Sequence, residues 1–163
     1  MYEHLFNEFL KSSDTLHVYK GGKLLFTSNK DRLIPLIEYI DGLAPSHQPV
    51  VIFDKIIGNA AALLCVKATC QQVYSPLGSQ LAIRTLDKFG IKYYFSEIVP
   101  YIQKPDGEGM CPMESLSINK EPEEFYKAVK NLINKTWQRG QAAGRYCEVV
   151  TADLRQFCHG TRL

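Results

Sequence analysis

Hydrophobic residues recur at two spacings along this chain of 163 residues, and each spacing predicts a type of element. Apolar residues three and four positions apart predict helices over residues 2–10, 33–40, 54–65, 75–89 and 123–137. Short runs rich in β-branched and aromatic residues predict strands over residues 15–19, 23–27, 50–53, 71–74 and 91–95. The order of elements is therefore helix, two strands, helix, and then alternating strands and helices.

The spacing of the strands predicts how they pair. Gly21-Gly22 separates the first two strands, which is typical of an antiparallel hairpin. The three later strands are joined by helices, and a helical crossover requires parallel pairing. We expect the strands at 50–53, 71–74 and 91–95 to lie parallel in one sheet, with the hairpin over 15–27 at or near its edge. The fold class is therefore α/β with a mixed sheet.

Composition limits the classes of protein that fit. An apolar fraction of 45%, with 22% charged residues, is that of an ordinary globular domain. The net charge of +2 and the scattered lysines and arginines do not support nucleic-acid binding. No apolar run reaches the roughly twenty residues that span a bilayer, so we expect no membrane association and a cytoplasmic location. The five cysteines are an odd number without paired spacing, which predicts reduced thiols and no disulfide framework.

The pattern also divides the chain into two parts. Residues 1–137 hold all the predicted strands and helices and form the expected α/β domain. A polar, glycine-containing segment follows, so residues 138–163 are predicted to be a C-terminal appendage. We expect this appendage to pack on the domain as an added helix or strand, or to form a contact in a homo-oligomer.

Cys111 is the strongest candidate for a reactive side chain. Cys111 directly precedes Pro112 and lies three residues before Glu114, which predicts a helix N-terminus with the cysteine at the N-cap. Unpaired backbone N–H groups and the positive end of the helix dipole favour a thiolate there. The alternative is a buried structural cysteine in a tight connection.

Four other polar residues are candidates because of their expected position. Asp54 and Lys55 follow a buried strand, and the carboxyl ends of parallel strands are where such sheets bind ligands. We expect Asp54, as a general base or ligand anchor, to lie near Cys111, with Lys55 and Glu114 as polar partners in binding a ligand. Ser75 opens a predicted helix and is a secondary candidate for holding an anion. Ordinary helix capping and solvation explain these residues equally well.

Two segments carry a resemblance to a known family. The order of elements, the segment 54–62 (DKIIGNAAA) and the segment 109–114 (GMCPME) resemble a bacterial family of unknown function with a cytidine-deaminase-like fold. The resemblance runs from the first helix to about Trp137. It implies a three-layer α/β/α sandwich whose mixed sheet begins with the hairpin, and it implies no particular activity.

The zinc site of true deaminases is missing from the sequence. Those enzymes need a His or Cys beside a glutamate on one helix and a PCxxC pair on the next. The matching segments here, 29–32 (NKDR) and 54–58 (DKIIG), supply neither, so we expect no metal and no cofactor.

Two hypotheses for the function follow from the sequence. One is a small-molecule enzyme or carrier, acting on a nucleotide-like or base-like ligand through Cys111. The other is a noncatalytic ligand-sensing or protein-interaction domain. The sequence leaves open whether the protein is an enzyme.

Overall fold

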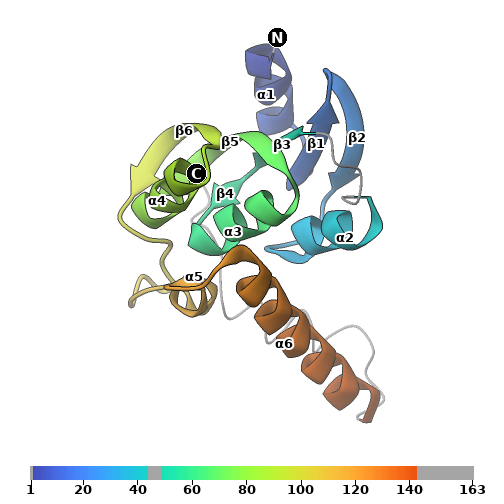
Figure 1. Ribbon diagram of the computed structural model, residues 1–163, viewed down its shortest axis with the longest axis vertical. Helices are drawn as coiled ribbons and strands as arrows, with labels where there is room; N and C mark the ends of the chain where they lie inside the picture. Colours follow the sequence, from blue (N-terminus) through green and yellow to red (C-terminus); the bar gives the residue numbers. More distant parts are fainter. Residues whose placement is uncertain (1, 44–48, 143–163) are drawn as a thin grey trace.

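The computed structural model describes residues 2–43 and 49–142. Six helices and six strands follow one another along the described residues (Figure 1). The helices are α1 (Tyr2–Lys11), α2 (Ile34–Gly42), α3 (Asn59–Lys67), α4 (Gln80–Lys88), α5 (Pro112–Ser117) and α6 (Pro122–Ala142). The strands are β1 (Leu16–Lys20), β2 (Lys23–Ser28), β3 (Val50–Asp54), β4 (Ile56–Ile57), β5 (Cys70–Ser79) and β6 (Lys92–Val99).

All six described strands form one mixed sheet, which includes the five strands that the sequence predicts and a sixth, β4, that it does not. The hairpin β1–β2 turns at Gly21 and Gly22, whose positive φ angles suit a residue without a Cβ. β1 pairs antiparallel with β3, and β3, β4 and β6 all run parallel to β5. Because β6 pairs along residues 72–79 of β5, β3 and β4 must share the other side of β5. The spatial order is therefore β2, β1, β3 with β4, β5, β6, and the hairpin ends at one edge as expected.

Two predicted helix starts are wrong. The helix expected from Asp54 begins at Asn59, because Ile56 and Ile57 first form β4 against β5. The helix expected from Ser75-Pro76 begins at Gln80, because β5 continues to Ser79. Pro76 has no N–H to donate to a strand ladder, yet pairing with β6 resumes at Leu77. In both cases strand pairing with a distant segment overrides a local helix signal.

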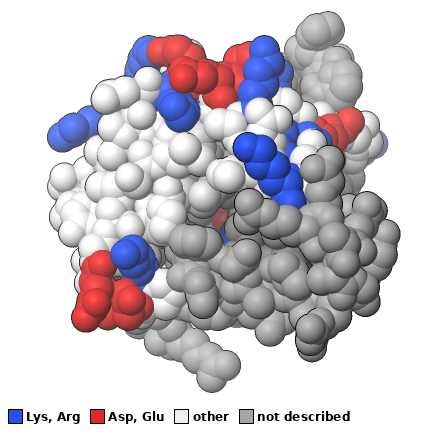
Figure 2. All heavy atoms as spheres, turned by 90° about the horizontal axis from the view of Figure 1, so that it is seen from below, with Lys and Arg blue, Asp and Glu red and all other residues white. Residues whose placement is uncertain are grey.

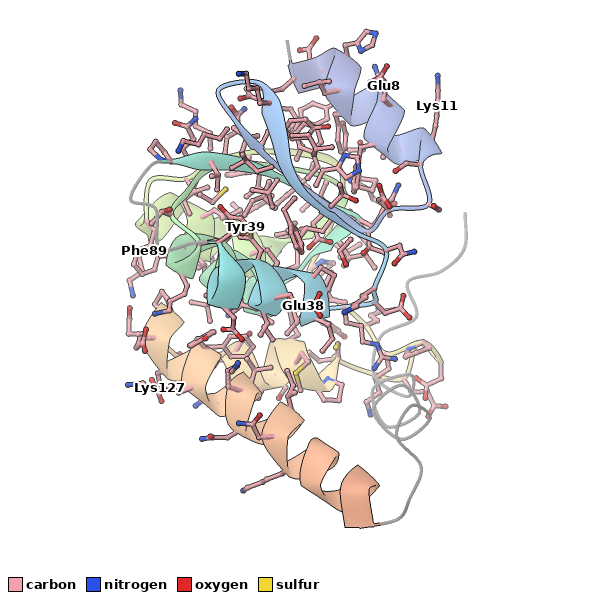
Figure 3. The ribbon with its side chains drawn as sticks, turned by 90° about the vertical axis from the view of Figure 1, so that its right-hand side faces the viewer. Glu8, Lys11, Glu38, Tyr39, Phe89 and Lys127 are labelled. Atoms are coloured by element: carbon pink, nitrogen blue, oxygen red, sulfur yellow. The ribbon has the colours of Figure 1, made fainter. Side chains whose placement is uncertain are left out.

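The two faces of the sheet are covered differently, which gives a three-layer α/β/α arrangement. Figure 3 views the sheet from the side, with α1 on one face and α2 on the other; Tyr39 of α2 lies toward the sheet. The face below α2, α3 and α4 is mainly aliphatic, with Leu36, Ile52, Leu64 and Leu86 fully buried. The face below α1 is aromatic, with a buried cluster of Phe6, Phe9, Tyr19, Phe53 and Tyr74 joined by Tyr2.

Helix α6 packs on α3 and is fixed by polar contacts at its first turns. Phe125 and Val129 are buried in the aliphatic core. Tyr126 and Lys130 both donate to the carboxylate of Asp41 at the end of α2. The second half of α6 extends away from the sheet (Figure 1). The residues after Ala142 lie outside the described part of the chain, so the appendage over 138–163 stays a prediction.

Candidate functional site

Cys111 occupies the predicted place at the start of a helix. It is the N-cap of α5, and Pro112 is the first helical residue. Its side chain is 1% exposed, and its N–H donates to the carbonyl of Ile102 at 2.8 Å. The sulfur is disulfide-bonded, whereas Cys65 and Cys70 are free thiols. The prediction that all five cysteines are reduced is wrong for Cys111, and its sulfur is not the free thiolate that we expected.

Glu114 places a buried carboxylate with three hydrogen-bond donors at this end of the sheet. It is 2% exposed, and both oxygens of its carboxylate accept hydrogen bonds. Oε2 accepts from the N–H of Asn59 at 2.6 Å, and Oε1 accepts from Ser79 Oγ at 2.8 Å and from the N–H of Ile102 at 3.3 Å. Asn59 begins α3 and Ser79 is the N-cap of α4. One buried carboxylate therefore joins the N-termini of two helices.

The first residue of α3 extends this network to α5 and α4. The amide nitrogen of Asn59 donates to the Ser117 carbonyl at 3.1 Å and to Ser117 Oγ at 2.9 Å. Its amide oxygen accepts from the hydroxyl of Thr85. These contacts hold α5 against the carboxyl ends of β4 and β5, the position where we expected a ligand.

Gly58 is the small residue that allows the Glu114 carboxylate to approach the N-terminus of α3. A Cβ at Gly58 would lie 2.4 Å from Glu114 Oε2 and 2.8 Å from Ile102 Cγ1, closer than atoms can pack. Gly58 is the N-cap of α3 and has no side chain to cap the helix. The carboxylate of Glu114 thus takes the capping role that an Asp or Ser at the N-cap normally has.

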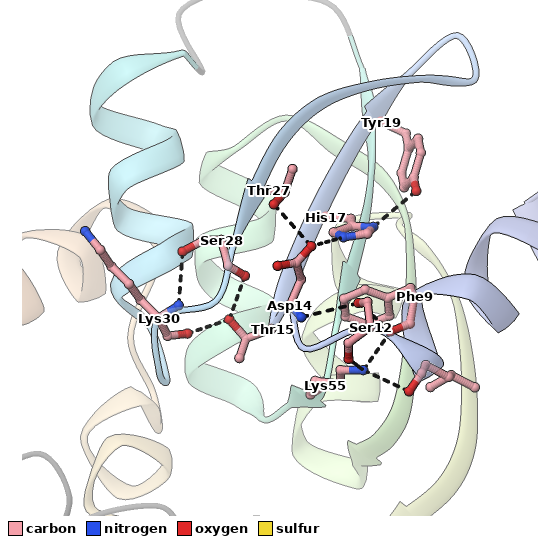
Figure 4. Close-up of polar contacts among 11 residues, drawn as sticks. Phe9, Ser12, Asp14, Thr15, His17, Tyr19, Thr27, Ser28, Lys30 and Lys55 are labelled. Atoms are coloured by element: carbon pink, nitrogen blue, oxygen red, sulfur yellow. Dashed lines mark hydrogen bonds and ion pairs between the residues drawn. The ribbon is translucent and has the colours of Figure 1, made fainter.

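Lys55 does not join this network. It binds the end of α1, on the other face of the sheet. Its Nζ donates to the carbonyls of Phe9 at 2.8 Å, Leu10 at 3.4 Å and Ser12 at 3.4 Å, and lies 4.2 Å from the centre of the Phe9 ring. Figure 4 shows the amine among these carbonyls at the end of α1. Partial burial lowers the pKa of Lys55, against the opposing effect of Asp14 and Asp54. The structure brings Cys111 and Glu114 together on α5 and directs Lys55 to α1.

Asp54 is a buried carboxyl at the end of β3. It is 7% exposed, and Oδ1 accepts from the N–H of Ile56 at 3.1 Å. Burial raises its pKa from 3.8 to about 7, although this N–H and the charge of Lys55 act in the other direction. Asp54 follows Ile52 by two residues, so it faces the aliphatic core. The catalytic roles assigned to Asp54 and Cys111 stay predictions.

Ser75 does not stand at a helix N-terminus. It is fully buried within β5, where its Oγ donates to the Leu77 carbonyl at 2.8 Å and accepts from the Leu77 N–H at 3.2 Å. The predicted anion site depended on a helix starting at Ser75, and the helix begins five residues later. Ser79 takes the capping role, accepting from the N–H of Ala82 at 3.0 Å.

The sequence did not predict the series of hydrogen bonds that links Asp14, His17 and Tyr19 at β1. His17 Nε2 lies 2.8 Å from Asp14 Oδ2, and His17 Nδ1 lies 3.2 Å from the Tyr19 hydroxyl (Figure 4). His17 and Tyr19 are two residues apart and share one face of the strand, which is the signal that could have linked them. Burial first, and the charge of Glu8 second, raise the pKa of Tyr19. The phenol is therefore a hydrogen-bonding group within the aromatic core and not an activated base.

Charges and metal ligands add no second site in the described residues. These residues contain no group of three His, Cys, Asp or Glu side chains placed to hold a metal ion. In the view of Figure 2, basic and acidic side chains lie in small groups around a broad uncharged area. No helix in the described part of the chain is both long and apolar enough to cross a membrane.

Comparison with known proteins identifies a family. A family model described as TM1506, domain of unknown function (DUF1893), matches residues 5–133. The chain belongs to this family. A crystal structure of a DUF1893 family protein (TM1506) from Thermotoga maritima at 2.70 Å resolution is similar, with 25% sequence identity and a TM-score of 0.72. The alignment covers 80% of this chain and 88% of that chain. No curated protein matches the sequence.

The DUF1893 assignment agrees with the expected family of unknown function and with the mixed α/β fold. Neither the family description nor the solved relative names a deaminase or any ligand. The matched region ends at residue 133, within α6, so it contains every strand of the described residues, together with Cys111 and Glu114.

Proposed function

We propose that this DUF1893 protein is a noncatalytic interaction domain with a cytidine-deaminase-like fold. The observation that supports this is that both oxygens of the Glu114 carboxylate are engaged in hydrogen bonds within the protein. Its two carboxylate oxygens bind donors from α3, α4 and the loop at Ile102, all inside the protein. A general acid or base needs its oxygen free for a proton in transit to substrate. Glu114 instead stabilises the place where an α/β enzyme would hold its reacting groups.

Cys111 supports the same proposal. A nucleophilic cysteine acts as an accessible thiolate. Cys111 is 1% exposed and disulfide-bonded, and its side chain makes no capping hydrogen bond at the start of α5. A covalent mechanism would first require reduction of this bond and opening of the loop that precedes α5. The competing hypothesis, a small-molecule enzyme or carrier, depends on that opening.

Turnover assays separate the two hypotheses. The purified protein, with and without a thiol reductant and with zinc or chelator added, is incubated with cytidine, deoxycytidine, adenosine and guanine, and released ammonia is measured. We expect no release above a buffer control in any condition. Ammonia release that is lost in both Cys111→Ser and Asp54→Asn would overturn the proposal, provided that circular dichroism shows both variants folded. Asp87→Asn, an exposed change in α4, is the matched control.

A further inference from the structure

The two edges of the sheet differ in how they are protected. β6 pairs with β5 in a parallel register that holds over most of its length, and among the described residues no strand pairs with its other side. Two large apolar side chains are exposed on it, Tyr94 at 53% and Ile98 at 50%. A long regular edge strand with exposed apolar residues is a template for pairing with another strand.

The β2 edge carries the features that discourage such pairing. The β1–β2 ladder contains a register shift between Val18 and Tyr19, and a bulge of this kind twists an edge away from a partner. Lys20 and Lys23 flank the turn and add charge to this edge. Leu24 and Leu25 are exposed to a similar degree as the residues on β6, at 47% and 44%. β6 also carries two exposed charged residues, Lys92 and Glu97, so the difference between the edges is in regularity and not in charge or exposed apolar area.

We propose that β6 is a dimer interface, where it pairs antiparallel with β6 of a second copy of this chain about a two-fold axis at Ser96. This inference deepens the proposed interaction function by naming the partner, and it rests on that function. The reason is self-complementarity. With Ser96 opposite Ser96, Tyr94 of each subunit lies opposite Ile98 of the other. The two-fold axis therefore forms the Tyr94–Ile98 pair twice on one face of the sheet, and each exposed apolar residue packs against an apolar partner.

The alternative registers fit less well. On the other face the same register sets Tyr93 opposite Val99 and Phe95 opposite Glu97. Shifting the centre to Phe95 would place Ile98 opposite Lys92 and Tyr94 opposite Ser96, so each exposed apolar residue would meet a polar one. Shifting it to Glu97 would place two glutamates directly opposite, which is destabilising. The pairing joins two six-stranded sheets into one.

An engineered disulfide tests both the dimer and its register. Directly opposite residues of an antiparallel pair have Cα atoms roughly 4.5 to 5.5 Å apart, within the range that a disulfide spans. Ser96→Cys should therefore give a covalent dimer on mild oxidation, seen on a nonreducing gel. Mass spectrometry should map the crosslink to a peptide pair joined at position 96 of both copies. Lys92→Cys is the control, since its two copies would lie roughly 27 Å apart along the paired strands. A Lys92→Cys dimer formed as readily as the Ser96→Cys dimer would overturn the register.

Light scattering after gel filtration tests the interface without cysteine chemistry. The full chain should have twice its monomer mass of 18.5 kDa. Ile98→Lys should weaken dimerisation by roughly tenfold or more, because the charge is introduced twice at one interface. Leu24→Lys, on the opposite edge and 47% exposed, should leave the mass unchanged. A monomer at all concentrations, or a dimer lost only in Leu24→Lys, would overturn the inference. Neither result bears on turnover, so the noncatalytic proposal fails or stands on the ammonia assay alone.

Discussion

Lys55 and Glu114 each stabilise a helix end from a different element, but they do so in opposite environments. Lys55 is partly buried and binds carbonyls at the C-terminus of α1, where a cation is favourable. Glu114 is 2% exposed and binds N–H and O–H donors at the N-termini of α3 and α4, where an anion is favourable. The signs of charge are those that the helix dipoles require in both places.

The difference between the two lies in what their removal leaves behind. Water can reach the carbonyls at the end of α1 when Lys55 is shortened, since the amine is only partly buried. Water cannot easily reach the donors around Glu114, because Asn59, Ser79 and Ile102 are buried with it. An unsatisfied buried donor costs more than a lost hydrogen bond at the surface. Depth of burial, more than the number of contacts, should decide how much each charge stabilises the fold.

Removing the carboxylate of Glu114 should have the largest effect. Glu114→Ala leaves three buried donors without an acceptor and creates a cavity, so we expect a loss of about 3 to 5 kcal/mol in the free energy of unfolding. Urea denaturation followed by circular dichroism measures it. Glu108→Ala, an exposed change in the loop before α5, should have almost no effect. Equal midpoints for the two variants would contradict the role given to Glu114.

Asp54 sharpens the comparison because it is a buried carboxyl with fewer donors. Its pKa is raised to about 7, so the folded protein holds a proton that the unfolded chain releases near 3.8. Its contribution to stability is therefore lost as the pH rises from about 4 to 7. Asp54→Asn keeps an acceptor for Ile56 and cannot ionise. We expect the variant to be more stable than wild type at pH 8 by roughly 2 to 4 kcal/mol.

The difference between Asp54→Asn and wild type should shrink at pH 5, where wild-type Asp54 is protonated when folded. Urea midpoints at pH 5 and pH 8 give this difference directly. Asp87→Asn, at an exposed position in α4, should leave the pH dependence of stability as in wild type. If the wild type had a higher urea midpoint than Asp54→Asn at pH 8, the ionised carboxylate would be stabilised by contacts beyond those described.

Gly58 tests the packing around Glu114 without changing any charge. Gly58→Ala places a Cβ 2.4 Å from Glu114 Oε2, so the carboxylate must move away from α3. We expect a loss of about 1 to 3 kcal/mol, measured by urea denaturation. Gly42→Ala is the matched control, because a Cβ there meets no atom within 4 Å. If the two substitutions cost the same, the close approach of Glu114 to α3 is not maintained in solution.

Lys55 should give the smallest change. Lys55→Met keeps an apolar side chain against the Phe9 ring and removes the donors to the end of α1, so we expect a loss of about 1 kcal/mol. Thermal melting at low and high salt checks it, with Lys11→Met, an exposed change in α1, as control. A loss as large as that of Glu114→Ala would contradict the dependence on burial.

The sequence predicted most of the elements because periodicity is a local signal. The hairpin and α2 follow from spacing within one segment, and the parallel pairing follows from the helices predicted between successive strands. The errors at Asp54 and Ser75 arose where a segment keeps pairing with a strand far away in sequence. No spacing rule within the segment carries that information.

The site was predicted in part for the same reason. The spacing of Cys111, Pro112 and Glu114 correctly placed a helix N-terminus. It gave no indication that Glu114 serves α3 and α4, two helices that begin far earlier in the chain. The hydrogen bonds that link Asp14, His17 and Tyr19 were missed because they depend on the path of the chain between α1 and β1. Contacts between elements, unlike periodicity within one, become visible only in the folded chain.

The aromatic layer under α1 gives the protein an internal optical signal. Tyr2, Tyr19 and Tyr74 lie with Phe6 and Phe53 in fixed orientations, with ring centroids between 4.8 and 6.2 Å apart. Rings held in such an asymmetric environment give circular dichroism in the near ultraviolet, and that signal disappears when packing is lost. Because α1 covers this face, its release removes part of the near-ultraviolet signal, while the buried Tyr39 on the other face keeps its own contribution. The far-ultraviolet spectrum follows the whole chain, so the two together distinguish release of α1 from global unfolding.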